Sequence, residues 1–212
     1  MRAFTIFFRS LKYFYDELYL LAAVSLVWWV AVLLVLPGPP VTAGLYLVAS
    51  RIVRGKRVNW SFFTEAVREY IWTSWKVTLV SVISLVMIVV NLFFYAIRAT
   101  GGLQYAAIVF LYLALIWLGL HIYVFPLLVR MEQPDVITIF RNALLLSLGQ
   151  PIVTFLLLVI LAVVGILSTF LAILLVLVFP PVLALASCGA TEYLLEKAQA
   201  VQEKRGKGDN RD

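Results

Sequence analysis

Long runs of apolar residues, separated by short polar connections, dominate the hydrophobicity pattern of the chain. The clearest runs cover residues 18–36, 77–97, 103–129 and 151–190. A helix needs about 20 consecutive apolar residues to cross a bilayer. The last run is long enough for two crossings, and we expect its turn at residues 165–169. The pattern therefore predicts about five membrane-spanning helices.

The segment of residues 41–53 is apolar but short. A helix over it reaches only about 20 Å, against a hydrocarbon core of roughly 30 Å. It is either a short sixth crossing or a helix that continues past the prolines of residues 37–40 into the interface. The predicted fold is thus all-α, a polytopic transmembrane helix bundle of five to six spans.

Two connections between the runs show the pattern of amphipathic helices. In residues 60–75, and again in residues 136–148, apolar side chains recur at helical spacing. The charged side chains, such as Glu65 and Arg141, fall on the other side of each helix. Helices of this kind lie flat at the membrane surface or pack beneath a bundle. We expect both segments to be interfacial.

The same order of features recurs three times along the chain. Each unit has an interfacial helix, a span out, a span back and a proline near its end. The units cover about residues 1–57, 58–131 and 132–195, and the interfacial helices share a Phe-x-x-Ala motif at residues 63–66 and 140–143. Recurrence in a fixed order indicates duplicated building blocks in parallel orientation. The alternative is that every membrane protein alternates apolar and basic blocks.

The composition indicates that lipid surrounds much of the chain. Of 212 residues, 64% are hydrophobic and only 13% are charged, whereas about a quarter of the residues in a soluble domain are charged. The sequence therefore predicts one integral membrane domain over residues 1–195, with the lipid bilayer as its partner. Residues 196–212 are polar and should form a short, frayed helix in the cytoplasm. We expect the first span to be retained, because no signal-peptide cleavage site follows it.

Basic residues gather at the ends of the apolar runs. They occupy the connection of residues 51–76, the connection of residues 130–141 and the tail. The positive-inside rule places all three in the cytoplasm and the turn of residues 99–102 outside. The N-terminus is also cytoplasmic if residues 41–53 cross, which we favour because three basic residues precede the first run. The net charge of +6 does not indicate nucleic-acid binding, since no basic stripe or nucleic-acid fold motif accompanies it.

The residue types on which enzymes depend are scarce in this chain. It has one histidine and one cysteine, and the predicted spans contain no carboxylate. Metal sites need several such ligands, and a nucleophile needs a base within reach. Cys188 and His121 fall in different spans, so we expect Cys188 to be a small buried hydrophobe. The sequence predicts no enzyme activity, no metal and no cofactor.

His121, in the middle of a span, is the clearest polar feature. Counting residues in both directions from the Gly101-Gly102 turn places Ser81 and Ser84, on the preceding span, at the same depth as His121. We call this depth counting. A neutral imidazole bonded to a serine hydroxyl would be a structural contact, and the alternative is a solute or proton site. Asn91 lies at the depth of residues 110–112. We expect it to hydrogen-bond the neighbouring helix, with solute binding as the alternative.

Three tryptophans and one glutamate are predicted to lie at the membrane surface. Trp60, Trp72 and Trp75 fall where an aromatic belt is expected at the membrane surface. Sugars also stack on aromatic rings, so sugar binding is the alternative. Glu192 lies just past the last apolar run, and we expect it to be an interfacial residue rather than a proton carrier.

Several short motifs resemble one family. They are Leu34-Val35-Leu36-Pro37, Pro40-Val41-Thr42-Ala43-Gly44-Leu45-Tyr46, Arg51, Phe62-Phe63 with Trp75-Lys76, Phe125-Pro126-Leu127 and residues 140–142. On these motifs nearly the whole chain resembles the YesL-like family of small bacterial integral membrane proteins, whose molecular function is unassigned. The resemblance implies a bacterial cytoplasmic (inner) membrane. It also implies a sugar-related role by association, because members are often neighbours of carbohydrate-uptake systems.

Two classes of function fit these observations. The first is a non-enzymatic accessory protein that binds a membrane-protein partner, or a second copy of itself, in a carbohydrate-uptake system. The second is a small-solute (sugar) transporter or facilitator built from the repeated units. The scarcity of membrane-embedded charge favours the first class, because ion-coupled carriers usually need such groups. Sugar facilitators do not, so the second class stays open, and the ligand is not specified by the sequence.

The topology predicts which positions an impermeant thiol reagent can reach. In a chain with Cys188→Ala, we expect reagent added outside to label a cysteine at Gly101 but not one at Lys56 or Lys204. Labelling is measured on intact cells, with permeabilised cells as the control. Strong labelling from outside at Lys56 or Lys204 would overturn the topology.

Overall fold

The computed structural model describes residues 2–132, 135–170 and 176–209, and these residues contain helices and no strand. The predicted all-α class is therefore confirmed. The α-helices are α1 (Arg2–Asp16), α2 (Leu18–Leu33), α3 (Gly38–Val53), α4 (Trp60–Glu69), α5 (Ile71–Phe93), α6 (Ala106–Arg130), α7 (Val136–Gly149), α8 (Pro151–Phe170) and α10 (Phe179–Asp209). Between α5 and α6 lie a π-helical turn, η1 (Phe94–Arg98), and a 3-10 helix, η2 (Gly101–Tyr105).

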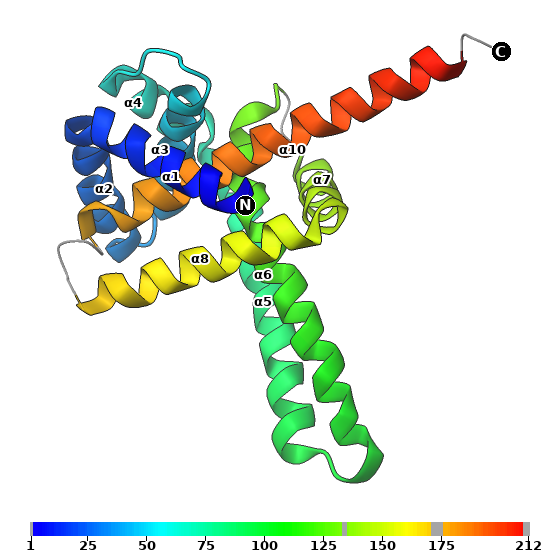
Figure 1. Cartoon of the computed structure of the whole chain (residues 1–212). Coiled ribbons are helices and arrows are strands. Elements are labelled where there is room, and N and C mark those ends of the chain that lie inside the picture. The colour runs from blue at the N-terminus through cyan, green and yellow to red at the C-terminus, as the bar shows by residue number, and fades with distance from the viewer. Residues whose placement is uncertain (1, 133–134, 171–175, 210–212) are drawn as a thin grey trace.

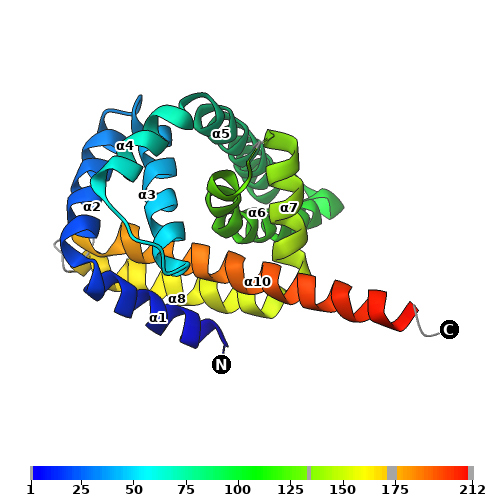
Figure 2. The same cartoon turned by 90° about the horizontal axis from the view of Figure 1, so that it is seen from above.

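The helices run crosswise rather than in one parallel bundle. Figure 1 shows α5 and α6 as a long hairpin that projects from the rest of the protein, while α8 runs across α6 near its base. Seen from above, α1, α8 and α10 lie side by side, and α2 and α3 run across them (Figure 2). α10 contacts α1, α3, α6 and α8, so it connects the hairpin to the other helices.

α3 is the central helix of the fold, and most of its residues are buried. It packs against α2, α4, α6 and α10. Gly44 allows α4 to approach closely, because a Cβ atom there would lie 2.9 Å from the Phe63 ring. Pro39 and Pro40 fit in the first turn, where helical N–H groups have no intrahelical partner. The short segment whose crossing the sequence leaves open thus forms much of the core.

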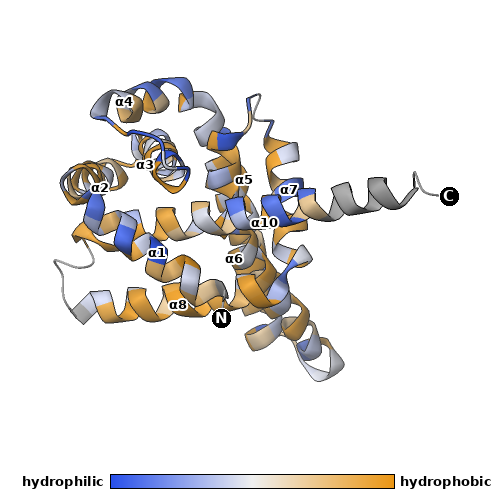
Figure 3. Cartoon of the chain, turned by 45° about the horizontal axis from the view of Figure 1, so that its top comes forward, coloured by the Kyte–Doolittle hydropathy of each residue, from blue (hydrophilic) through white to orange (hydrophobic). Residues whose placement is uncertain are grey.

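Among the described residues, three helical stretches are long and apolar enough to cross a membrane: Ile71–Arg98, Gly101–Arg130 and Pro151–Thr169. α1 and α2 together are a fourth candidate, although the pair is bent by 97°. Few side chains of the three stretches are buried inside the protein, and Figure 3 shows their apolar character over α5, α6 and α8. Exposed apolar helices of this length are typical of a membrane protein. The larger number of five to six spans stays a prediction.

The two predicted amphipathic connections are helical. The Asn59 side chain accepts a hydrogen bond from the Trp60 N–H at the start of α4, and Asp135 accepts one from the Thr138 N–H in α7. The first connection differs from the prediction because α4 ends at Glu69 and α5 begins at Ile71. Trp75 therefore belongs to a candidate span, and its indole N–H donates to the Leu36 carbonyl.

The predicted turn at residues 165–169 is wrong. α8 continues through Gly165 to Phe170. A Cβ atom at Gly165 would lie 3.2 Å from the Phe179 ring, so this glycine accommodates the packing of α10 against α8. Glycine inside a helix costs only about 1 kcal/mol relative to alanine, which such packing can offset. The connection between the two helices includes residues 171–175, outside the described part of the chain.

The structure bears on the predicted tail but does not decide the predicted repeat. The predicted tail is helical, since α10 runs without a break to Asp209, and the last three residues fall outside the described part. The three predicted units contain α1–α2–α3, α4–α5–α6 and α7–α8–α10. Each unit begins with the helix that the sequence predicts to be interfacial, but only α5 and α6 form a long projecting hairpin (Figure 1). Duplication therefore stays a prediction.

Candidate functional site

The predicted contact between His121 and Ser81 is present. His121 Nε2 lies 2.9 Å from Ser81 Oγ, and His121 Nδ1 lies 3.0 Å from the Trp117 carbonyl oxygen. A carbonyl only accepts hydrogen bonds, so we assign the hydrogen of a neutral ring to Nδ1, and Nε2 then accepts from the Ser81 hydroxyl. Depth counting identified this contact because α5 and α6 are antiparallel helices with the same rise per residue.

Ser84 bonds a different partner from the one expected. The Trp117 indole N–H donates to Ser84 Oγ over 2.9 Å, and the Ser84 hydroxyl donates to the Ser81 carbonyl. The Trp117 ring also stacks on His121, with centroids 3.7 Å apart. These four residues, Ser81, Ser84, Trp117 and His121, form what we call the hairpin cluster. It joins α5 to α6 where the hairpin leaves the rest of the protein.

The hydrogen bond predicted from Asn91 to the neighbouring helix is wrong. The Asn91 side-chain amide donates to the Met87 carbonyl, 2.8 Å away on the same helix. One turn further along, Tyr95 stacks on Phe110 with centroids 5.4 Å apart. Polar side chains can bond the carbonyl four residues earlier in their own helix, and Asn91 does so here. Ring stacking rather than an amide joins the helices near this depth.

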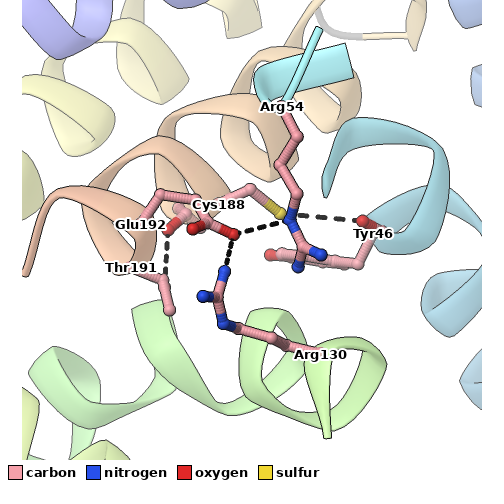
Figure 4. Close-up of polar contacts among 7 residues, drawn as sticks. Tyr46, Arg54, Arg130, Cys188, Thr191 and Glu192 are labelled. Carbon is pink, nitrogen blue, oxygen red and sulfur yellow. Dashed lines mark hydrogen bonds and ion pairs between the residues drawn. The ribbon is translucent and has the colours of Figure 1, made fainter. Parts of the chain in front are cut away.

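A charged junction lies where α3, α6 and α10 meet, and the sequence did not reveal it. One carboxylate oxygen of Glu192 accepts from Arg54 Nε, at 2.7 Å, and from Arg130 Nη1 (Figure 4). Arg54 follows the last residue of α3, and Arg130 is the last residue of α6. Basic side chains are favourable at helix C-termini, where the helix dipole is negative. Glu192 therefore connects three helices through one acid.

Packing beneath the charges holds the same helices together. Cys188 lies one turn before Glu192 on α10, and its thiol donates to the Tyr46 carbonyl of α3 over 3.6 Å. The Tyr46 ring stacks on Phe125 of α6, with centroids 5.3 Å apart. Cys188 is buried, as predicted, and Figure 4 shows it beside the ion pairs. The charged junction therefore rests on an apolar contact between the three helices.

The electrostatics of the charged junction are unbalanced. Two guanidinium groups share one carboxylate, which leaves a net positive charge. The Glu192 side chain is 17% exposed, and those of Arg54 and Arg130 are 32% and 30% exposed. Water therefore reaches the arginines more easily than the acid. Such partly buried ion pairs position helices, and loss of the shared acid would leave two cations facing each other.

A cavity of about 280 Å³ lies beside the charged junction, between α1, the end of α3 and α10. Its polar lining includes Arg9, Ser10, Glu192 and Glu196. Tyr13 and Tyr193 also line it, so the walls combine both signs of charge with aromatic rings. This lining can hold a small polar molecule. Within the part of the chain that the structure describes, no group of three or more His, Cys, Asp or Glu residues is arranged to hold a metal ion.

A sequence signal for the charged junction did exist. Arg54 and Arg130 lie at the ends of apolar runs, where the positive-inside rule explains them as markers of topology. Glu192 is the acidic residue that comes directly after the last apolar run. Counting depth from the ends of the runs would have placed the three at one level. What it would not have shown is that α10 packs against both α3 and α6, which depends on the tertiary structure.

Comparisons with protein-family models, with curated proteins and with solved structures found no match to this chain. The resemblance to the YesL-like family stays a prediction that rests on the short motifs quoted above. The function is therefore argued from the contacts of the chain itself.

Replacement of Glu192 tests the charged junction. We expect Glu192→Gln to lower the free energy of unfolding by about 1–2 kcal/mol, because two partly buried arginines lose their shared anion. Thermal unfolding in detergent measures the change. Glu196→Gln is the matched control, since Glu196 lines the same cavity but is not the acid of these ion pairs. Equal melting of the two variants would show that the charged junction does not stabilise the fold.

Replacement of His121 tests the hairpin cluster. We expect His121→Leu to cost about 1 kcal/mol, near the average for side-chain hydrogen bonds in membranes. The cost is small because Ser81 can bond back to its own helix. His121→Gln should cost less, and Asn91→Leu, which removes a bond within one helix, is the control. Thermal unfolding and the uptake of labelled sugars by the reconstituted chain are measured for each variant. Lost uptake with an unchanged melting temperature would contradict a structural role for His121.

Proposed function

We propose that this chain is a non-enzymatic integral membrane protein that binds partner helices and is linked to carbohydrate uptake. The observation that carries the proposal is the α5–α6 hairpin, which projects from the rest of the protein (Figure 1). Its apolar side chains are exposed on both helices. Large exposed apolar surfaces mark contact with a membrane or with another protein. The link to carbohydrate uptake rests on the family resemblance alone.

The exposed surface of α5 has the spacing of a helix-packing seam. Leu79, Val82, Val86, Val90 and Phe93 recur at steps of three or four residues, and each is at least 51% exposed. Steps of three and four residues place side chains on one face of a helix. Helices in membranes associate through close packing of such faces, because lipid provides no hydrophobic driving force. This face of α5 is the proposed partner-binding stripe.

The polar residues of the hairpin support partner binding over transport. A solute path needs polar groups that face water or the solute. Here the side chains of Ser84, Trp117 and His121 bond one another or the backbone, and the Asn91 amide bonds its own helix. These bonds engage the groups that were the candidates for solute binding. The hairpin is therefore better suited to packing than to conduction.

One observation favours the alternative of a small-solute transporter. The cavity beside the charged junction has both charged and aromatic lining, which suits a small polar molecule such as a sugar. It lies between α1 and α10, away from the α5 stripe. The two functions would thus depend on different surfaces, and one experiment can address both.

Crosslinking in native membranes tests the proposal. A photoactivatable amino acid at Val86 or Val90 should give a discrete crosslinked product, identified by mass spectrometry as a component of a sugar-uptake system or as a second copy. The same amino acid at Gly102, in the turn of the hairpin, is the control. Uptake of labelled sugars by the purified, reconstituted chain is measured in parallel. Sugar uptake without a discrete crosslink would favour a small-solute transporter over a partner-binding protein.

A further inference from the structure

An apolar groove of about 340 Å³ lies where α6, α7 and α8 meet. Its walls include Leu115, Gly119, Leu148, Phe155, Leu158 and Ala162. Leu115, Leu148 and Phe155 are each at least 46% exposed, so the groove opens on the outer surface. α6 and α8 both belong to stretches long and apolar enough to cross a membrane. The groove is therefore placed where the surroundings are hydrocarbon.

The walls of the groove consist mainly of apolar side-chain carbon atoms. Two of the lining residues carry hydroxyl groups, Ser147 and Thr154, and both are buried. The Thr154 hydroxyl lies 2.8 Å from the hydroxyl of buried Tyr123 and within hydrogen-bond distance of the Gln150 carbonyl. A polar solute would lose its hydrogen bonds with water on entering such a groove. An apolar occupant loses none.

Gly119 forms the floor of the groove. A Cβ atom there would lie 2.9 Å from Ser147 Oγ and 3.1 Å from Thr154 Cγ2. The α6 backbone therefore packs directly against the corner where α7 turns into α8. This close approach seals the inner side of the groove, so an occupant can enter only from the outer surface.

The shape of the groove decides between a helix and a hydrocarbon chain. α8 runs across α6 (Figures 1 and 2), so a straight helix cannot follow both walls. A flexible chain can bend from one wall to the other.

We infer that this groove binds one acyl chain of a membrane phospholipid. The chain lies against α6 and α8, over Gly119, with the apolar side chains of both helices around it. The inference goes beyond the proposed function, because the partner-binding stripe is on α5 and shares no residue with the groove. The two can therefore fail separately.

The site is tested on the full chain in phosphatidylcholine vesicles. A small fraction of the lipid carries a diazirine midway along one acyl chain, and crosslinked peptides are mapped by mass spectrometry. We expect several-fold more crosslinking on residues 115–119 and 154–162 than on residues 82–90 of α5, although residues 82–90 are the more exposed. Ala162→Phe, which fills the groove, should remove this excess. Val163→Phe is the matched control, because Val163 is the exposed neighbour that does not line the groove.

Three outcomes would overturn the inference. The first is even labelling of α5, α6 and α8, which would show bulk lipid contact only. The second is an unchanged excess in Ala162→Phe. The third is a crosslink to a second copy from a photoactivatable amino acid placed at Leu118, which lines the groove; this would identify a dimer interface instead. If Ala162→Phe melts at a lower temperature, Leu118→Phe replaces it, since Leu118 also lines the groove and is exposed.

Discussion

The carboxylate of Glu192 accepts hydrogen bonds from two arginines, one at the end of α3 and one at the end of α6. Because α10 carries this acid and also packs against α1 and α8, the ion pairs join the ends of α3 and α6 to these helices as well. A cation without a partner at this partly buried place would be costly. The charges therefore hold the ends of α3 and α6 against α10, while Tyr46, Phe125 and Cys188 pack beneath them.

The α5–α6 hairpin has few contacts with this framework beyond its base, so it depends on its own interactions. The hairpin cluster joins its two helices near the base, and the stacked rings of Tyr95 and Phe110 join them further out. Both kinds of contact suit hydrocarbon surroundings. A hydrogen bond satisfies polar atoms that lipid cannot, and ring stacking uses no polar atom at all.

Three surfaces of different chemistry result from the crosswise packing. The stripe on α5 offers rigid apolar side chains to a partner helix. The groove between α6, α7 and α8 is lined mainly by apolar side chains and is the proposed site of an acyl chain. The cavity between α1 and α10 is the polar one, and it lies beside the charged junction. Polar and apolar surfaces are thus separated in space, so the proposed binding of lipid, of a partner helix and of a small polar molecule would use different residues.

The sequence by itself determined the helical class, the apolar stretches, the two amphipathic connections and the contact between His121 and Ser81. Each of these depends on the periodicity of one segment, or on two antiparallel helices joined by a short turn, where depth follows from counting residues. The continuation of α8 past Gly165, the bond of Asn91 to its own helix and the meeting of Arg54, Arg130 and Glu192 were decided only by the tertiary structure. They depend on which faces of distant helices pack together, and on α8 and α10 running across the others. The sequence pattern of an apolar helix does not depend on the direction in which the helix runs relative to the others, so local sequence does not specify how distant helices cross.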